Sequence, residues 1–349
     1  MVGDFTWRDA GRTVVFRRGG VGAAVGVLRE QGVEEFELLS TQRALAGGPD
    51  LEGAEGLTAV AEGVHEVQSG QVPAAAAALL AALSPPPDAS KGARARPLVA
   101  LGGGRVIDVA KAVASVSGAD VVAIPTTMSG AEMTGSHRLP EGAEGRARRS
   151  VRPTLVIADP EAMTSQPEEQ LRASSMNALA HGADTLYLPL SNPVSEMTAL
   201  RGAGLIGAAL DEAPEGRDRA ALAVGSILCG YAIDSAGMGL HHLVCQTLVR
   251  LCGTPHAETN AAVLPHAVAL LADRAPEVFE RLAEALGTDR AGLSNRISQL
   301  GLPPRLSEVG GDALKLDEAV EAMLRRPELQ RVPRPPDGVE LRELVEAAW

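Results

Sequence analysis

Residues 98–111 read LVALGGGRVIDVAK, and this stretch decides the fold. Four apolar residues that suit a buried strand run directly into Gly102, Gly103 and Gly104, and helical spacing follows. Glycines let the backbone approach a pyrophosphate closely, and the N–H groups at a helix start favour its negative charge. The stretch therefore predicts a dinucleotide phosphate site, with a tight strand-to-helix turn that binds nothing as the open alternative.

Short apolar segments alternate with helix-length segments through the first 160 residues. The strand-like segments are 13–16, 36–39, 98–101, 121–124 and 155–157. Strands spaced in this way predict a parallel, doubly wound sheet. Helical periodicity dominates afterwards, for example over 174–188, and the Pro-rich stretch 85–96 predicts a surface loop. We predict an α/β N-terminal nucleotide-binding domain, residues 1–160, and an all-α C-terminal domain, residues 161–349.

Composition excludes several classes of function. The net charge of -12 and the aromatic fraction of 2% disfavour a nucleic-acid partner. No apolar run approaches the roughly 20 residues that span a bilayer, and no signal-peptide pattern opens the chain, so we expect no membrane partner and a cytoplasmic location. Cys229, Cys245 and Cys252 lack metal-finger spacing, and we expect them to be buried small residues.

A second loop with polar side chains follows the next predicted strand. Residues 124–134 read IPTTMSGAEMT, and the hydroxyls of Thr126, Thr127 and Ser129 suit phosphate, ribose or the nicotinamide amide. The alternative is a turn in which Thr127 or Ser129 caps a helix. Asp108 and Lys111 are spaced i, i+3, as in an ordinary exposed ion pair. The predicted cofactor-binding residues are Gly102, Gly103, Gly104, Asp108, Lys111, Thr126, Thr127 and Ser129.

Histidines are concentrated in the second half of the chain, with four of the seven between residues 241 and 266. Asn177 and His181 share one face of the predicted helix 174–188, His242 lies on a second helix, and His256 follows a turn. Such a set can hold Fe(II) or Zn(II), or it can orient and protonate a substrate without metal. We predict His181, His241, His242 and His256 as catalytic; a metal would use Asn177, His181, His242 and His256.

Five motifs occur in one order along the chain. They are GGG at 102–104 with Asp108 and Lys111, PTT at 125–127 with GAEMT at 130–134, MNALAH at 176–181, GLHH at 239–242 and PHAET at 255–259. Together they resemble the iron-containing alcohol dehydrogenase superfamily, which has the dehydroquinate synthase-like fold, and in particular its maleylacetate reductase branch. The resemblance implies hydride transfer between NAD(P)H and a carbonyl, an active site in a cleft between the two domains, and a homodimer.

The chain departs from the family pattern at presumed active-site positions. Asn177 stands where the metal-dependent branch has aspartate, and its neutral amide argues against a bound divalent metal. Gln246 replaces a histidine and cannot shuttle a proton near neutral pH. Leu243 replaces a lysine, Asn260 replaces a histidine, and Arg105 replaces a small residue. These departures lie mainly at positions presumed to contact the substrate or to transfer protons, whereas many positions presumed to bind the nucleotide follow the family pattern.

Three functions remain open from the sequence. The leading hypothesis is an NAD(P)H-dependent reductase of a small carbonyl or enoyl acid, in which Arg146, Arg148, Arg149 and Arg152 either clamp a carboxylate or form a solvated loop. The alternative is a non-redox dehydratase, cyclase or lyase of specialised metabolism that uses the cleft histidines as acid and base. A catalytically silent ligand-binding protein is the third.

Overall fold

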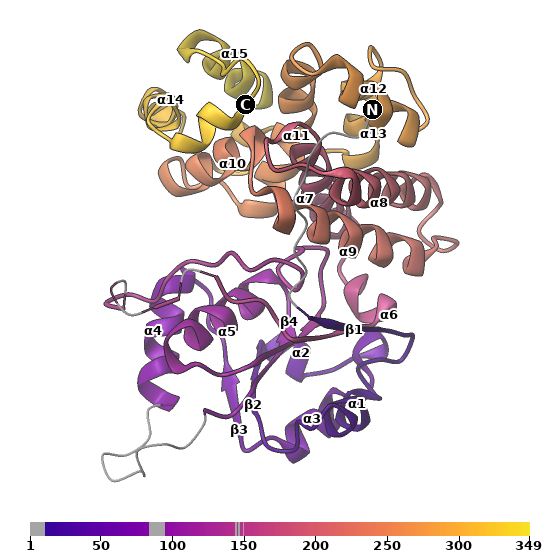
Figure 1. Ribbon diagram of the computed structural model, residues 1–349, viewed down its shortest axis with the longest axis vertical. Helices are drawn as coiled ribbons and strands as arrows, with labels where there is room; N and C mark the ends of the chain where they lie inside the picture. The colour runs from indigo at the N-terminus through magenta and orange to yellow at the C-terminus, as the bar shows by residue number, and fades with distance from the viewer. Residues whose placement is uncertain (1–10, 84–94, 144, 146, 149) are drawn as a thin grey trace. The chain divides into compact units, whose positions relative to one another are not determined.

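The computed structural model describes residues 11–83, 95–143, 145, 147–148 and 150–349 (Figure 1). The chain divides between Gln166 and Pro167 into two compact units, an α/β unit and a helical unit. Most of the predicted loop at 85–96 lies outside the described residues, as do Arg146 and Arg149.

A parallel sheet of six strands forms the centre of the α/β unit, in the order β1-β6-β5-β4-β2-β3. The strands are β1 (Thr13–Phe16), β2 (Glu37–Ser40), β3 (Gly63–Glu66), β4 (Leu98–Gly102), β5 (Val121–Pro125) and β6 (Leu155–Ala158). Every strand pair in this sheet is parallel, as predicted. The sequence reading missed β3, because this short edge strand carries no apolar run.

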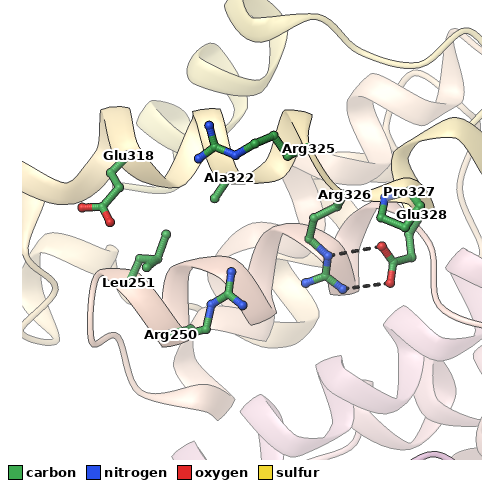
Figure 2. Close-up of a pocket in the computed structure, with 8 residues that line it drawn as sticks. All are labelled: Arg250, Leu251, Glu318, Ala322, Arg325, Arg326, Pro327 and Glu328. Atoms are coloured by element: carbon green, nitrogen blue, oxygen red, sulfur yellow. Dashed lines mark hydrogen bonds and ion pairs between the residues drawn. The ribbon is translucent and has the colours of Figure 1, made fainter.

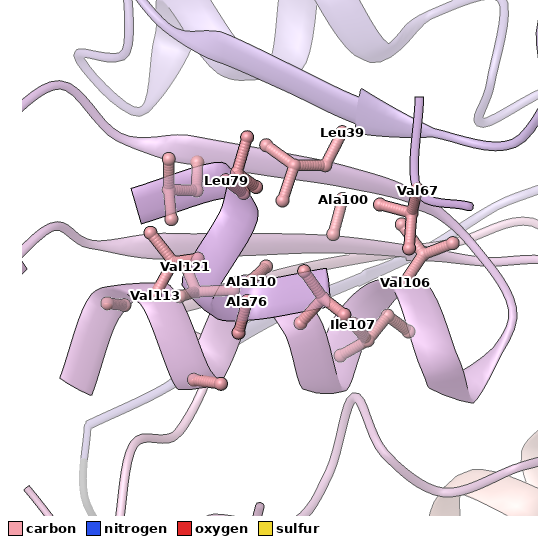
Figure 3. Packing of buried hydrophobic residues seen from close by; sticks show 14 of the residues in the cluster. Leu39, Val67, Ala76, Leu79, Ala100, Val106, Ile107, Ala110, Val113 and Val121 are labelled. Carbon is pink, nitrogen blue, oxygen red and sulfur yellow. The ribbon is translucent and has the colours of Figure 1, made fainter. Parts of the chain in front are cut away.

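Helices cover both faces of the sheet. Along β4, Val99 and Leu101 face one layer while Leu98 and Ala100 face the other, because successive side chains of a strand alternate. The first layer contains α1 (Ala24–Glu30), α3 (Ala54–Val60) and α6 (Pro160–Met163), and the second contains α4 (Val72–Leu83) and α5 (Gly104–Ser117) (Figure 3). Burial on both faces explains why these central strands are apolar throughout.

The strand order places the glycine turn where ligands bind. In the sheet, β4 and β2 are neighbours, and the chain continues from β4 through α5 to β5 in one direction and from β2 to β3 in the opposite direction. Adjacent strands whose connections diverge leave a crevice beyond their carboxyl ends, and open α/β sheets bind ligands there. Gly102 ends β4 and Ser40 ends β2, and the Ser40 hydroxyl donates to the carbonyl of Leu101 at 2.8 Å.

The helical unit surrounds one buried helix, α7 (Glu168–Tyr187), whose residues from Ala173 onward are all buried. The other α-helices of this unit are α8 (Pro193–Asp211), α9 (Arg219–Ala236), α10 (Leu240–Leu251), α11 (His256–Ala272), α12 (Pro276–Ala285), α13 (Leu293–Gly301), α14 (Leu316–Leu324) and α15 (Gly338–Ala348). No strand occurs among residues 167–349, which confirms the all-α prediction. A Cβ on Gly202 of α8 would lie 2.6 Å from the Cys229 sulfur, so glycine permits close approach of α8 and α9.

Composition also led to expectations about the three cysteines and about membrane-spanning helices. Cys229, Cys245 and Cys252 are all buried and free, as expected. Within the described ranges, no single helix is long and apolar enough to cross a membrane; the bent pair α9 and α10 meets that criterion only when the two helices are taken together.

Candidate functional site

The two predicted cofactor loops of the α/β unit lie against each other. Helix α5 begins at Gly104, and no side chain caps this end. A Cβ on Gly103 would lie 2.9 Å from the Thr127 methyl carbon, and one on Gly104 would lie 2.8 Å from the Ser129 Cβ. The glycines are therefore needed for the loop of residues 126–134 to reach the uncapped helix N-terminus. Such an N-terminus attracts an anion.

Hydroxyl groups in this second loop differ in their partners. The Thr127 Oγ1 is buried and has no hydrogen-bond partner among the described residues. The Ser129 hydroxyl accepts from the Ala131 amide at 3.3 Å, and the Thr126 amide donates to the Gly102 carbonyl at 3.1 Å. No helix begins in the described part of residues 127–150, so the helix-capping alternative is wrong. A buried hydroxyl without a partner fits a loop that contacts a bound ligand.

Lys111 has a different environment from the one predicted. Its side chain is fully buried, so the exposed-pair alternative is wrong. The ammonium donates to the Ser136, Ala131 and Thr134 carbonyls at 2.7, 3.0 and 3.2 Å, and it pairs with Asp108 at 2.8 Å. Lys111 thus holds the second loop against α5. This geometry gives no support to direct phosphate binding, because the ammonium's donors are already engaged.

Buried imidazoles form the predicted site of the helical unit. The rings of His181, from α7, and His242, from α10, are stacked with centroids 4.8 Å apart. His241 meets His242 edge-on, with centroids 5.0 Å apart. Asn177 lies one turn before His181 and is buried, whereas His256 is exposed at the start of α11. The structure brings His181, His241 and His242 together.

Asp184 is the central residue that sequence reasoning missed. This fully buried carboxylate, one turn after His181, accepts from the His242 Nδ1 at 2.7 Å and from the Tyr187 hydroxyl at 2.6 Å. It also accepts from the Gly239 amide at 3.0 Å, and the Tyr187 oxygen accepts from the Leu240 amide at 2.6 Å. Residues of α7 thus cap the N-terminus of α10. An aspartate within an otherwise apolar helical pattern was the available signal, because buried carboxylates need partners.

Burial and neighbouring charges set the protonation of the site. Burial raises the pKa of Asp184, but the hydrogen bond and charge of His242 outweigh it and lower the pKa to about 2. Burial, with His242 nearby, lowers the pKa of His181 well below its usual value and that of His241 to about 3. Asp184 is therefore an anion, and His181 and His241 are neutral imidazoles. His181 Nδ1 and His242 Nε2 are buried without hydrogen-bond partners among the described residues.

The side chain of His241 makes its contacts inside the protein core. Its Nε2 lies 2.9 Å from the Asn260 Oδ1, and the Asn260 amide donates to the His256 carbonyl at 2.7 Å. The Cys245 sulfur is 3.5 Å from the same imidazole nitrogen. Asn260 is a neutral partner, so this contact brings no titratable group to His241. The geometry favours a packing role for His241 over a catalytic one.

The donor set of the helical unit does not fit a divalent metal. Among the described residues, no group of three or more histidine, cysteine, aspartate or glutamate side chains is arranged to hold one. Asp184, the carboxylate at the site, is engaged by His242, Tyr187 and backbone amides, and Asn177 offers only a neutral amide. A cation here would be compensated by no available carboxylate. We therefore derive no chemical step through a metal.

A surface pocket elsewhere in the helical unit is distinct from the histidine pair. It has a volume of about 510 Å³, and its lining includes Arg250, Arg326 and Glu328 (Figure 2). Arg326 pairs with Glu328 through two nitrogens, at 3.3 and 3.1 Å, and its Nη2 donates to the Gln246 Oε1 at 3.1 Å. Gln246 is thus held by Arg326, one helical turn from His242.

Comparison with known proteins places the chain in a family. The family model described as the Fe-containing alcohol dehydrogenase family, C-terminal, matches residues 172–349, and the model for iron-containing alcohol dehydrogenase matches residues 88–160. A maleylacetate reductase from Burkholderia cepacia is 36% identical over 72% of this chain and 73% of its own length. One from Rhizobium sp. (strain MTP-10005) is 32% identical over 99% of this chain and 97% of its own.

A solved structure extends the same likeness to the whole fold. The crystal structure of maleylacetate reductase from Agrobacterium tumefaciens superposes with a TM-score of 0.84, at 30% identity, and covers 100% of this chain and 99% of that one. These relatives support an oxidoreductase, and the structure gives it an α/β unit and a helical unit. The chain belongs to the iron-containing alcohol dehydrogenase family, in its maleylacetate reductase branch.

Proposed function

We propose that this protein is an NAD(P)H-dependent reductase of a small carbonyl or enoyl acid. The observation that carries the proposal is the Asp184–His242 pair, in which the carboxylate binds one imidazole nitrogen and the other nitrogen has no protein partner among the described residues. A buried pair of this kind is suited to proton transfer. The relatives named maleylacetate reductase motivate the substrate class.

The α/β unit offers a site for the cofactor. The uncapped N-terminus of α5 and the glycine turn suit a pyrophosphate, and the partnerless Thr127 Oγ1 can donate to a phosphate or ribose oxygen. The residues we assign to cofactor binding are Gly102, Gly103, Gly104, Thr126, Thr127 and Ser129. Bound NAD(P)H would supply the hydride.

His242 is the proton donor in this proposal. Reduction of a carbonyl requires one proton in addition to the hydride. The Nδ1–H of His242 stays on Asp184, so the anion orients the ring and stabilises the imidazolium form. The Nε2 proton passes to the substrate oxygen, and solvent restores it after product leaves. His181, stacked on His242 and neutral, can direct its partnerless Nδ1 to the same substrate.

The predicted arginine clamp receives no part in this mechanism. The Arg148 guanidinium donates to the Ala114 carbonyl at 2.9 Å, close to the end of α5, and its own amide donates to the Ser115 carbonyl. This contact ties a loop to the protein, consistent with the surface-loop alternative.

The experiment that tests the proposal has two stages. Purified, metal-analysed protein is titrated with NADH and NADPH through nicotinamide fluorescence, and oxidation of the bound nucleotide is then followed at 340 nm with maleylacetate. We expect binding of at least one nucleotide and turnover that His242→Ala abolishes while binding persists. Absence of binding to folded protein would overturn the reductase proposal. Turnover by nucleotide-free protein would support the non-redox lyase class.

A further inference from the structure

Glu132 is a buried carboxylate that the mechanism above does not use. It lies in the turn at 130–133, which is closed by a hydrogen bond from the Met133 amide to the Gly130 carbonyl. Its side chain is fully buried, and neither Oε1 nor Oε2 has a hydrogen-bond partner among the described residues. Most buried polar groups in native proteins have a partner, and leaving a carboxylate without one costs several kcal/mol.

Two cations lie beside this turn but do not pair with the carboxylate. Lys111 binds the Ala131 and Thr134 carbonyls, and the Arg12 guanidinium donates to the Met133 carbonyl at 2.5 Å. Both cations hold the backbone of the loop. Burial raises the pKa of Glu132 to about 7, and its own backbone N–H, Lys111 and Arg12 oppose that shift only in part. The backbone is therefore fixed, while no side chain among the described residues binds the carboxyl group.

The position of Glu132 points to a ligand that offers hydroxyl donors. It lies in the loop after the series β4, glycine turn, α5 and β5. In dinucleotide-binding folds an acidic residue about 20 residues beyond the glycine turn accepts from a ribose hydroxyl, and Glu132 lies beyond that position, seven residues after the end of β5. Ala131, its neighbour, would be 3.8 Å from a Cβ on Gly104, so the turn reaches the glycine loop. Phosphate groups carry the same charge as the carboxylate and offer no donors. A vicinal diol offers two.

We propose that Glu132 is a cofactor-binding residue whose carboxylate accepts hydrogen bonds from a ribose diol of the nicotinamide dinucleotide. The side chain turns towards the ligand through its own rotatable bonds, and Lys111 and Arg12 keep the loop in place. This assignment rests on the proposed reductase function. It explains why a loop supported by two cations leaves its carboxylate unpaired.

The test compares Glu132→Gln with wild-type protein and with Glu141→Gln, which changes an exposed glutamate of the same unit. NADH and NADPH binding are measured by fluorescence titration, and the Tm is measured without nucleotide. We expect Glu132→Gln to weaken NADH binding about tenfold, the loss of one charge-assisted hydrogen bond. Its Tm should be unchanged or higher, because the substitution removes a buried unpaired charge. Glu141→Gln should match wild type in both measurements.

The outcomes distinguish failure of the Glu132 inference from failure of the reductase function. They also show whether Glu132 contacts the nicotinamide ribose or the adenosine ribose. Equal weakening for NADH and NADPH identifies the nicotinamide ribose, whereas a reduced preference for NADH identifies the adenosine ribose, which carries the extra phosphate in NADPH. Nucleotide binding by Glu132→Gln equal to wild type overturns this inference alone. Wild-type protein that binds neither nucleotide overturns it together with the reductase function. If Glu132→Gln has a lowered Tm, Glu132→Ala is titrated; wild-type affinity in that variant likewise overturns the inference.

Discussion

The glycine turn of the α/β unit and the histidine pair of the helical unit differ in what carries their chemistry. At the glycine turn, backbone N–H groups and the absence of side chains form the site, so any residue with a Cβ at Gly103 or Gly104 would meet the second loop. At the histidine pair, side chains from α7 and α10 determine the protonation and orientation of one another.

The largest expected effect concerns the histidine pair. His242→Ala removes the proposed proton donor, and general acid catalysis contributes about a hundredfold to ten-thousandfold. We expect kcat to fall about a thousandfold while the dissociation constant of NADH changes less than twofold, as measured by steady-state kinetics and fluorescence titration. His266→Ala, on α11, is the control and should retain wild-type kcat. A kcat within tenfold of wild type for His242→Ala would place the proton donor elsewhere.

Asp184→Asn tests whether the carboxylate supports both the imidazole and the start of α10. The substitution removes the buried anion that accepts from His242, Tyr187 and the Gly239 amide. Breaking one partner of a buried ion pair costs about 3 to 5 kcal/mol, so we expect a loss of unfolding free energy of about 3 kcal/mol in urea. Below neutral pH the loss should narrow progressively between about pH 4 and pH 2, because the pKa of Asp184 is lowered from 3.8 to about 2 and its stabilisation is fully present only above the higher value. A loss under 1 kcal/mol at pH 7 would contradict this role.

The sequence predicted the glycine turn of the α/β unit more completely than the histidine pair of the helical unit. The strands other than β3 and the glycine turn follow local rules of pattern and turn geometry. Asp184, Tyr187 and the burial of Lys111 depend on which helices and loops pack together, and no local spacing encodes that. His256 was predicted because it follows the turn before α11; its side chain is exposed, yet its charge lowers the pKa of both His181 and His241.

Gly104→Ala tests the backbone-based site with a matched control. The added Cβ would lie 2.8 Å from the Ser129 Cβ and would force the second loop away from α5. Overpacking of this kind costs about 1 to 3 kcal/mol. We expect unfolding free energy to fall by about 2 kcal/mol and NADH affinity to fall about tenfold. Gly26→Ala, in α1, meets nothing within 4 Å and should be neutral or stabilising. Identical behaviour of the two variants would show that contact with the second loop is not what requires glycine.

The smallest expected effect comes from restoring a family residue. Gln246→His introduces the histidine that the family resemblance implies, one turn after His242, and the present amide is held by Arg326 at 3.1 Å. Because the Asp184–His242 pair already supplies proton transfer in our proposal, we expect kcat between pH 6 and 8 to change less than about threefold. Gln246→Asn, which shortens the amide, separates loss of the Arg326 contact from the gain of an imidazole. A hundredfold rise in kcat for Gln246→His, absent in Gln246→Asn, would mean that protons pass through position 246. The side-chain site of the helical unit would then have lost a catalytic group, whereas the backbone site of the α/β unit has kept its glycines.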